Sequence, residues 1–121
     1  MLSEKNTVLV IIDVQGPLVQ VMHERQDLVT HLQKLIKGIQ AIGIPILWLE
    51  QNPARMGETV PEIRGLLSGH QSVLEKMSFS CCGEPKFMQN IEALGRQQII
   101  LAGIETHVCV YQTAADLLAR G

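Results

Sequence analysis

The sequence predicts an α/β domain in which a parallel sheet lies between two layers of helices. Three features predict it: strand-like runs that are continuously apolar, a helical apolar stripe between the first two runs, and an order in which strands alternate with helices. Continuous apolar strands are typical of parallel sheets, because helices cover both faces. The alternation favours a three-layer α/β/α, Rossmann-like arrangement.

The first half of the chain supplies two strands and a long helix. Residues 8–12 (VLVII) form the first strand, which a Gly-Pro pair soon follows. Residues 23–42 carry apolar side chains at helical spacing and end at a glycine in the position of a C-cap. Residues 44–49 (IPILWL) form the second strand, with its proline near the start, where proline is tolerated.

The second half begins with a polar loop that is rich in glycine and proline. It then alternates between weaker strands and short helices. We expect a loop over 50–70 with a short helix near 62–67, a weak third strand over 72–75, a helix over 84–94, a fourth strand over 98–102 and a last helix over 106–120.

Composition and charge exclude several classes of protein. Hydrophobic residues make up 46% of the chain and the formal net charge is -2, so no basic footprint for nucleic acid is present. No segment approaches the ~20 apolar residues of a transmembrane helix, and residues 1–6 lack the apolar core of a signal peptide. We therefore expect one cytoplasmic domain over residues 1–121, with no membrane partner.

Cysteines and histidines give no pattern of a disulfide framework or a metal box. The chain has three cysteines (Cys81, Cys82 and Cys109), and an odd number without a secretion signal argues against paired disulfides. Its four histidines are scattered and form no recognisable ligand spacing. We expect neither a metal nor another cofactor.

Three polar residues lie where parallel sheets place their ligands, beyond the carboxyl ends of the strands. Asp13 follows the first strand, Lys76 follows the third, and Cys109 lies in the first turn of the last helix. The partial positive charge of a helix N-terminus lowers a thiol pKa. Together the three residues describe a nucleophile, a proton acceptor and a cation that poises both. We expect limiting reagent to label Cys109 before the other cysteines.

Position alone leaves alternatives open for each of these residues. Cys109 could be a packed core thiol, Asp13 a turn aspartate and Lys76 a solvated surface lysine. His107, two residues before Cys109, could instead be the base of a Cys–His dyad.

Three segments resemble the isochorismatase-like hydrolases, also called cysteine hydrolases. They are LVIIDVQ (9–15), KMSFS (76–80) and AGIETHVCVYQTAADLLARG (102–121). The last segment is the most specific, because it combines a strand-end glycine, a threonine three residues before the cysteine and a TAxDLLxxG helix. The resemblance runs along essentially the whole chain.

The resemblance implies a role for each candidate. Asp13 would take the thiol proton, Lys76 would orient that aspartate, and Cys109 would attack a carbonyl carbon to form an acyl-enzyme that water then clears. The backbone N–H groups of Glu105 and Cys109 would form the oxyanion hole, aimed by a cis peptide bond between Ile104 and Glu105.

Other positions are assigned with less detail. By family position Gln15 and Phe79 would line the substrate pocket, and Trp48 would be pocket wall or core. The adjacent pair Cys81 and Cys82 would be reduced and structural, or would line the pocket.

Two departures from the family pattern are visible. Nicotinamidases of this family carry an Asp-x-His metal box after the second strand, whereas residues 50–58 read EQNPARMGE. The family domain normally continues for about two more strand–helix units, or ~60 residues. The implied strand order is 3-2-1-4-5-6, so we expect a domain truncated after the fourth unit, a free edge on the fourth strand and a homo-oligomer.

The resemblance implies hydrolysis of a C–N bond in a small amide, ureido or carbamoyl compound. Two alternatives remain at this point. The first is hydrolysis of a vinyl ether such as isochorismate, which need not use a cysteine nucleophile. The second is a catalytically inactive subunit or scaffold.

Overall fold

Four parallel strands form a single sheet in the order β3-β2-β1-β4. The computed structural model describes residues 1–104 and 106–120, without the side chains of residues 106 and 107. The observed order confirms the first four places of the implied arrangement. The strands are β1 (Thr7–Ile12), β2 (Ile46–Gln51), β3 (Leu74–Lys76) and β4 (Gln98–Gly103).

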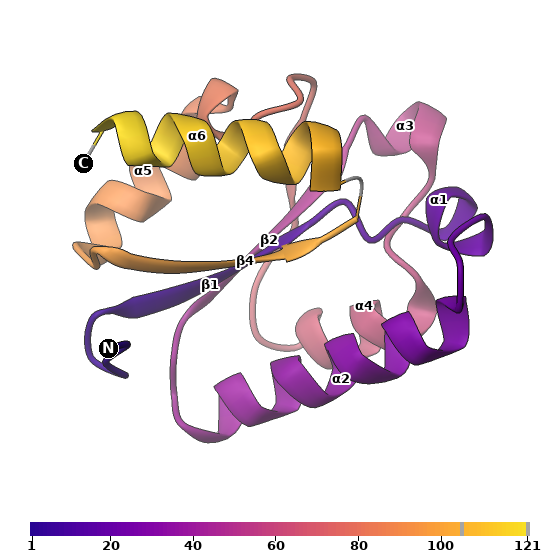
Figure 1. Ribbon diagram of the computed structural model, residues 1–121, viewed down its shortest axis with the longest axis horizontal. Helices are drawn as coiled ribbons and strands as arrows, with labels where there is room; N and C mark the ends of the chain where they lie inside the picture. Colours follow the sequence, from indigo (N-terminus) through magenta and orange to yellow (C-terminus); the bar gives the residue numbers. More distant parts are fainter. Residues whose placement is uncertain (105, 121) are drawn as a thin grey trace.

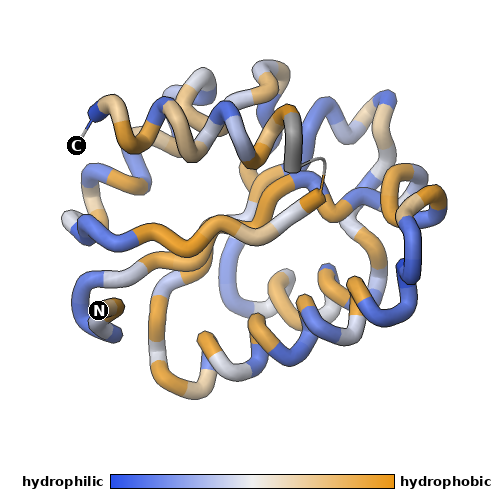
Figure 2. The backbone as a smooth tube through the Cα atoms, in the orientation of Figure 1, coloured by the Kyte–Doolittle hydropathy of each residue, from blue (hydrophilic) through white to orange (hydrophobic). Residues whose placement is uncertain are grey.

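The central strand β1 divides the core into two halves. All six of its residues are buried, because β2 and β4 flank it and helices cover both faces. Leu9 and Ile11 belong to one apolar cluster, and Val10 and Ile12 belong to the other. This is the period-two alternation of a strand, here apolar on both sides as the sequence predicts. The tubes of β1 and β4 are accordingly mostly apolar in Figure 2.

One face of the sheet is covered by α2 (Arg25–Ala41) and α4 (Pro61–Leu67), as Figure 1 shows below the strands. The predicted apolar stripe of the long helix is the buried one. It consists of Val29, Leu32, Ile36 and Ile39, at the spacing of one helical face.

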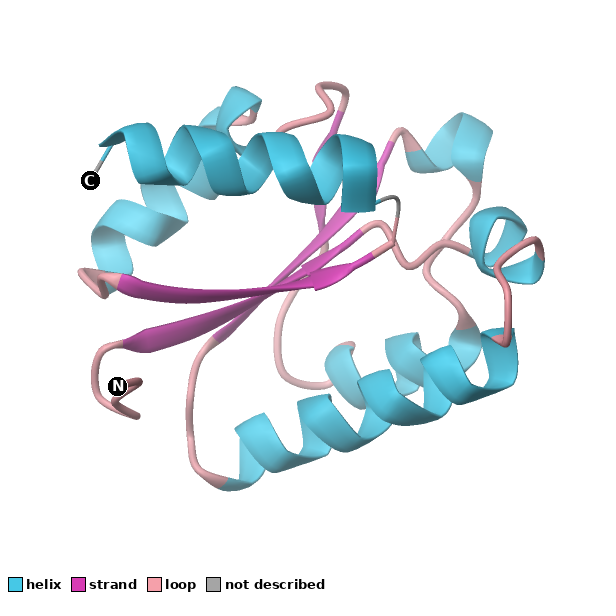
Figure 3. Ribbon diagram, in the orientation of Figure 1, coloured by secondary structure: helices cyan, strands magenta, loops and turns pink. Residues whose placement is uncertain are grey.

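The opposite face is covered by α5 (Pro85–Leu94) and α6 (Tyr111–Arg120), so the three layers are confirmed (Figure 3). A π-helical turn, Thr106–Val110, leads into α6. Such turns are frequent at functional sites. None of the described helices is long and apolar enough to cross a membrane.

The sequence missed two short helices and misplaced the ends of two strands. The missed helices are α1 (Gly16–Gln20) and α3 (Pro53–Met56), both with proline in the first turn, where its missing N–H costs nothing. The second strand runs to Gln51 and the third to Lys76, because these two residues pair in register. Because both strands end in polar side chains, the apolar pattern of the sequence did not indicate these last residues.

Strand β4 pairs with β1 on one side, and no other described strand lies on its second edge. All six of its residues are half-buried. An apolar groove of about 730 Å³ lies beside it, between α5 and α6. Its apolar lining includes Met88, Ile91, Ile99, Leu101 and Leu117.

Gly103 ends β4 where the backbone of β1 approaches closely. A methyl group on Gly103 would overlap the carbonyl oxygen of Ile12, the residue before Asp13. We expect Gly103→Ala to lower the free energy of unfolding by about 1–3 kcal/mol, because backbone must move to relieve the clash. Denaturant unfolding measures this change.

Gly38→Ala is the matched control for this substitution. Gly38 lies within α2 and a Cβ there would meet no atom within 4 Å, so the control should be neutral or slightly stabilising. Equal destabilisation by both substitutions would contradict the expected close approach at Gly103.

Candidate active site

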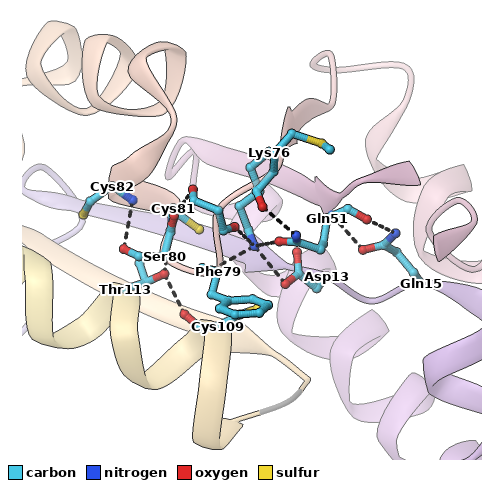
Figure 4. Close-up of polar contacts among 12 residues, drawn as sticks. Asp13, Gln15, Gln51, Lys76, Phe79, Ser80, Cys81, Cys82, Cys109 and Thr113 are labelled. Atoms are coloured by element: carbon cyan, nitrogen blue, oxygen red, sulfur yellow. Dashed lines mark hydrogen bonds and ion pairs between the residues drawn. The ribbon is translucent and has the colours of Figure 1, made fainter. Parts of the chain in front are cut away.

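The carboxyl ends of β1 and β3 bring Asp13 and Lys76 together, as the sequence predicts. Lys76 Nζ lies 3.1 Å from Asp13 Oδ2, and the two side chains are 0% and 1% exposed (Figure 4). Strict strand alternation would direct residue 13 to the face of Leu9 and Ile11. Asp13 instead has φ 58°, in the left-handed region that aspartate tolerates. This turn ends the alternation next to the ion pair.

The buried ammonium of Lys76 is fully provided with acceptors. It donates to Asp13 Oδ2 at 3.1 Å and to Gln51 Oε1 at 2.6 Å. The carbonyl oxygens of Ser78 and Phe79 accept at 3.1 and 2.9 Å. Four acceptors therefore surround three N–H groups. Such saturation satisfies the hydrogen-bonding capacity of the buried amine and leaves no N–H group free for a substrate.

Gln51 is a site residue that sequence reasoning missed. It ends β2 in register with Lys76, so the two side chains lie side by side on neighbouring strands. The available signal was its place at the strand end, the same edge that holds Asp13. The local sequence pattern of that stretch indicates only a loop without a metal box.

Gln15 braces this edge rather than lining a pocket. Its side-chain amide makes two bonds to the backbone of Gln51, accepting from the N–H at 2.8 Å and donating to the carbonyl at 2.9 Å. It also donates to the carbonyl of Gly57 at 2.6 Å. Gln15 is 0% exposed, and both of its amide hydrogens bond to backbone carbonyl oxygens. The predicted pocket role is wrong for this residue.

Cys109 lies in the π-helical turn, on the same face of the sheet as Ile12. Its thiol pKa is raised to about 12, mainly by burial and then by a hydrogen bond to Asp13 and the charge of that carboxylate. Lys76 opposes these effects. The expectation of a lowered thiol pKa is therefore wrong, because burial and the carboxylate outweigh any helix-terminal charge. The thiol rests protonated beside a group that can accept its proton.

The two carboxylate oxygens of Asp13 differ in their contacts, since Oδ2 accepts from Lys76 at 3.1 Å. Asp13 Oδ1 is buried and has no hydrogen-bond partner of normal geometry among the described residues. Nucleophile–base contacts are often loose without substrate and tighten in the complex. One oxygen of Asp13 is thus held by Lys76, while the other is free to accept a proton.

Thr113 is a second residue that the sequence did not single out as part of the site. Its hydroxyl donates to the Cys109 carbonyl at 2.7 Å and accepts from the N–H of Cys81 at 2.9 Å. It therefore ties the turn that carries Cys109 to the segment that follows Lys76. Cys81 is buried and Cys82 partly exposed, and all three cysteines are free thiols.

Two buried thiols predict a loss of stability in alkali. The pKa is raised from 9.0 to about 11 for Cys81, chiefly by burial, and to about 12 for Cys109. Above pH 9 the unfolded chain releases protons that the folded chain retains. The free energy of unfolding should therefore fall as pH rises, by at most ~1.4 kcal/mol per unit for a buried thiol. Urea unfolding across this range measures the slope.

Cys81→Ala supplies the control for this pH dependence. It should remove part of the slope, because the alanine variant has one fewer buried thiol to keep protonated. A slope that is unchanged in Cys81→Ala would show that other groups cause the alkaline loss.

The two other residues predicted to line the pocket, Phe79 and Trp48, differ in their surroundings. Phe79 is 55% exposed and its carbonyl accepts from Lys76 at 2.9 Å, and its pocket role stays a prediction. Trp48 is 2% exposed and belongs to the apolar cluster between the sheet and helices α2 and α4. Its ring N–H donates to Thr59 Oγ1 at 2.8 Å. Since Cys109 belongs to the cluster on the other face, Trp48 is core and its pocket role is wrong.

Glu105, and with it the predicted oxyanion N–H and the Ile104–Glu105 cis peptide, lies outside the described residues, as does the His107 side chain. Within the described part of the chain, no group of three or more His, Cys, Asp or Glu residues is placed to hold a metal ion.

Comparison with known proteins identifies the family. The family model described as Isochorismatase domain matches residues 7–121. The chain is 40% identical over 95 residues to isochorismatase domain-containing protein 1 of Salmo salar, a match that covers 78% of this chain and 33% of that protein. Matches to the first curated relatives thus span less than two thirds of their length.

Three solved structures share the fold. MAR1 ribonuclease from Caenorhabditis elegans is 32% identical with a TM-score of 0.90, covering 99% of this chain and 61% of that one. Escherichia coli YcaC, titled an octameric hydrolase of unknown specificity, is 19% identical with a TM-score of 0.92, covering 99% and 60%. N-carbamoylsarcosine amidase from Thermoplasma acidophilum is 24% identical with a TM-score of 0.81, covering 95% and 77%. The chain belongs to the isochorismatase family and has the α/β fold of its hydrolases.

Proposed function

We propose that the chain is a cysteine-dependent hydrolase that cleaves a C–N bond in a small amide, ureido or carbamoyl compound. One observation carries this proposal. A protonated Cys109 thiol lies beside a buried Asp13 carboxylate that has one oxygen held by Lys76 and the other without a partner in the described part of the chain. That arrangement supplies a nucleophile, a base and a group that orients the base.

The reaction proceeds through an acyl-enzyme. Cys109 gives its proton to Asp13 as the sulfur attacks the carbonyl carbon, and the tetrahedral intermediate carries the charge on oxygen. Asp13 then passes the proton to the nitrogen, the C–N bond breaks and the amine leaves. Water attacks the thioester, Asp13 takes one proton from it, and that proton returns to the departing sulfur. The backbone N–H groups of Glu105 and Cys109 are proposed to bind the oxyanion.

Lys76 acts on Asp13 and not on the substrate. Its three N–H groups already have four acceptors inside the protein. Its charge offsets that of the carboxylate and holds one oxygen in place, which leaves the other without a hydrogen-bond partner among the described residues.

Two family names guide the choice of substrates. The Thermoplasma structure is named an N-carbamoylsarcosine amidase, but its similarity shows the fold alone, so the name only suggests carbamoyl compounds for screening. The Caenorhabditis elegans structure is named a ribonuclease, which makes RNA the second candidate substrate. The net charge of -2 and the engaged Lys76 disfavour RNA, because RNA binding requires available cations.

A substrate screen tests the proposal. It covers small amides, ureido and carbamoyl compounds, with RNA and a vinyl ether as separate arms. Wild type is compared with Cys109→Ala and with Cys82→Ala, the partly exposed neighbouring thiol, as matched control. We expect turnover of a C–N compound that Cys109→Ala abolishes, Cys82→Ala retains and a chelator leaves intact. Turnover that survives Cys109→Ala would favour the vinyl ether reaction, and no turnover in any arm would favour a scaffold.

We also infer that the chain works as a homo-oligomer. Support comes from the Escherichia coli YcaC structure, which shares the fold and is described as an octameric hydrolase. Size-exclusion chromatography with light scattering is expected to give a multiple of the chain mass. A cooperatively folding monomer would contradict the inference.

A further inference from the structure

Gln51 is held in a single orientation by bonds at both its backbone and its side chain. The Gln15 amide binds its backbone N–H and carbonyl at 2.8 and 2.9 Å. The Gln51 side chain places Oε1 against the Lys76 ammonium at 2.6 Å and donates from Nε2 to the Met77 carbonyl at 3.0 Å. An ammonium only donates and a carbonyl only accepts, so these partners fix which end of the amide faces Lys76.

The bond to Gln51 competes directly with the catalytic ion pair. Lys76 Nζ is closer to the neutral amide oxygen, at 2.6 Å, than to the Asp13 carboxylate, at 3.1 Å. The ammonium charge is therefore shared between a neutral and a charged acceptor. The more the Lys76 charge interacts with Gln51, the less it offsets the charge of Asp13. The Asp13 carboxylate is then a stronger proton acceptor for Cys109.

We propose that Gln51 is a positioning residue, whose amide sets how much of the Lys76 charge is shared with Asp13. The inference rests on the proposed function, because it assigns Gln51 a role through the same base and nucleophile. Gln51 touches neither thiol nor substrate in this scheme. It acts through Lys76, and Gln15 acts in turn by holding Gln51.

The test compares two substitutions with opposite expected effects. Gln51→Glu places a second carboxylate against the ammonium, draws it from Asp13 and adds negative charge near the thiol. Gln51→Met removes the competing acceptor, so the ammonium pairs more fully with Asp13 and weakens its pull on the thiol proton. The Cys109 pKa should therefore rise in the first variant and fall in the second.

The measurement is the rate of Cys109 alkylation near pH 8.5, with each cysteine resolved by peptide mass spectrometry. We expect Cys109 to react roughly tenfold more slowly in Gln51→Glu and roughly threefold faster in Gln51→Met, following the fraction of thiolate. Two reagents of different size distinguish a change in the thiolate fraction of Cys109 from a change in how accessible its sulfur is. A changed thiolate fraction alters both rates by the same factor, whereas a changed access alters them unequally.

Gln40→Glu and Gln40→Met are the matched controls. Gln40 makes a similar bond, from Nε2 to the Leu66 carbonyl at 2.9 Å, but it lies on α2 away from the site. Both controls should leave the Cys109 rate within twofold of wild type, and the partly exposed Cys82 gives a reference rate in every sample. Shifts in the same direction for both Gln51 variants, shifts no larger than the controls, or unequal factors for the two reagents would overturn the inference.

Asp13→Asn separates this inference from the proposed function. If Asp13→Asn leaves the Cys109 rate unchanged, the thiol is not coupled to the carboxylate, and both proposals fall. If Asp13→Asn changes that rate while the Gln51 variants do not, only the role of Gln51 is overturned.

Discussion

Replacing Lys76 with methionine is expected to lower the free energy of unfolding by about 3–5 kcal/mol. The substitution keeps the length of the side chain but removes the only cation paired with Asp13 among the described residues. A carboxylate that is 1% exposed would then lie buried without a counter-charge. Gln51 and the Ser78 and Phe79 carbonyls would lose their shared donor at the same time. Urea unfolding at neutral pH measures the loss.

Lys34→Met provides the control for this substitution. Lys34 is exposed on α2, so its replacement should change stability by less than about 0.5 kcal/mol. The double variant Asp13→Asn/Lys76→Met should lose less than the sum of the two single changes, because each single change strands a buried partner. Strict additivity would mean that the buried pair is not coupled.

Replacing Asp13 with asparagine is expected to slow hydrolysis by roughly 10²–10⁴-fold. Asparagine has nearly the same shape but cannot take the thiol proton. Cys109 then has no described base, and burial, the largest cause of its raised pKa, still keeps its thiol protonated at neutral pH. The loss should appear in kcat/KM for any substrate that the screen finds, since the base is needed for the first attack.

The control for this variant is Asp27→Asn on α2, where the carboxylate is exposed and remote from the site. It should retain wild-type rates. Activity in Asp13→Asn within a few-fold of wild type would remove Asp13 from the mechanism. The ion pair would then serve stability alone.

The pairing of Asp13 with Lys76 was predictable because it follows from a rule of sheet geometry. In a parallel sheet, the carboxyl ends of all the strands meet at one edge, so polar residues at the ends of β1 and β3 indicate a site there even though β2 lies between the two strands. The continuous apolar runs likewise predicted β1 and β4, and the helical stripe predicted α2. Each of these features depends on local composition, which a single sequence displays directly.

What the sequence could not supply depends on three-dimensional detail. Gln51 became a site residue only when the β2–β3 register placed it beside Lys76, and no local pattern encodes register. The raised thiol pKa of Cys109 depends on burial and on its distance to Asp13. Trp48 was misassigned because an apolar run buried on both faces does not show which residue points to which side.

Capture of a covalent intermediate tests the central claim most directly. The chain is mixed with an active small amide or carbamoyl compound and quenched in acid within one turnover. After digestion, the mass of the peptide containing Cys109 is measured by mass spectrometry. The mechanism predicts that this peptide gains the mass of the acyl group, while the peptides containing Cys81 and Cys82 do not. The adduct should be absent in Cys109→Ala and form slowly in Asp13→Asn. Steady turnover with no acyl group on Cys109, or turnover that persists in Cys109→Ala, would contradict a cysteine nucleophile.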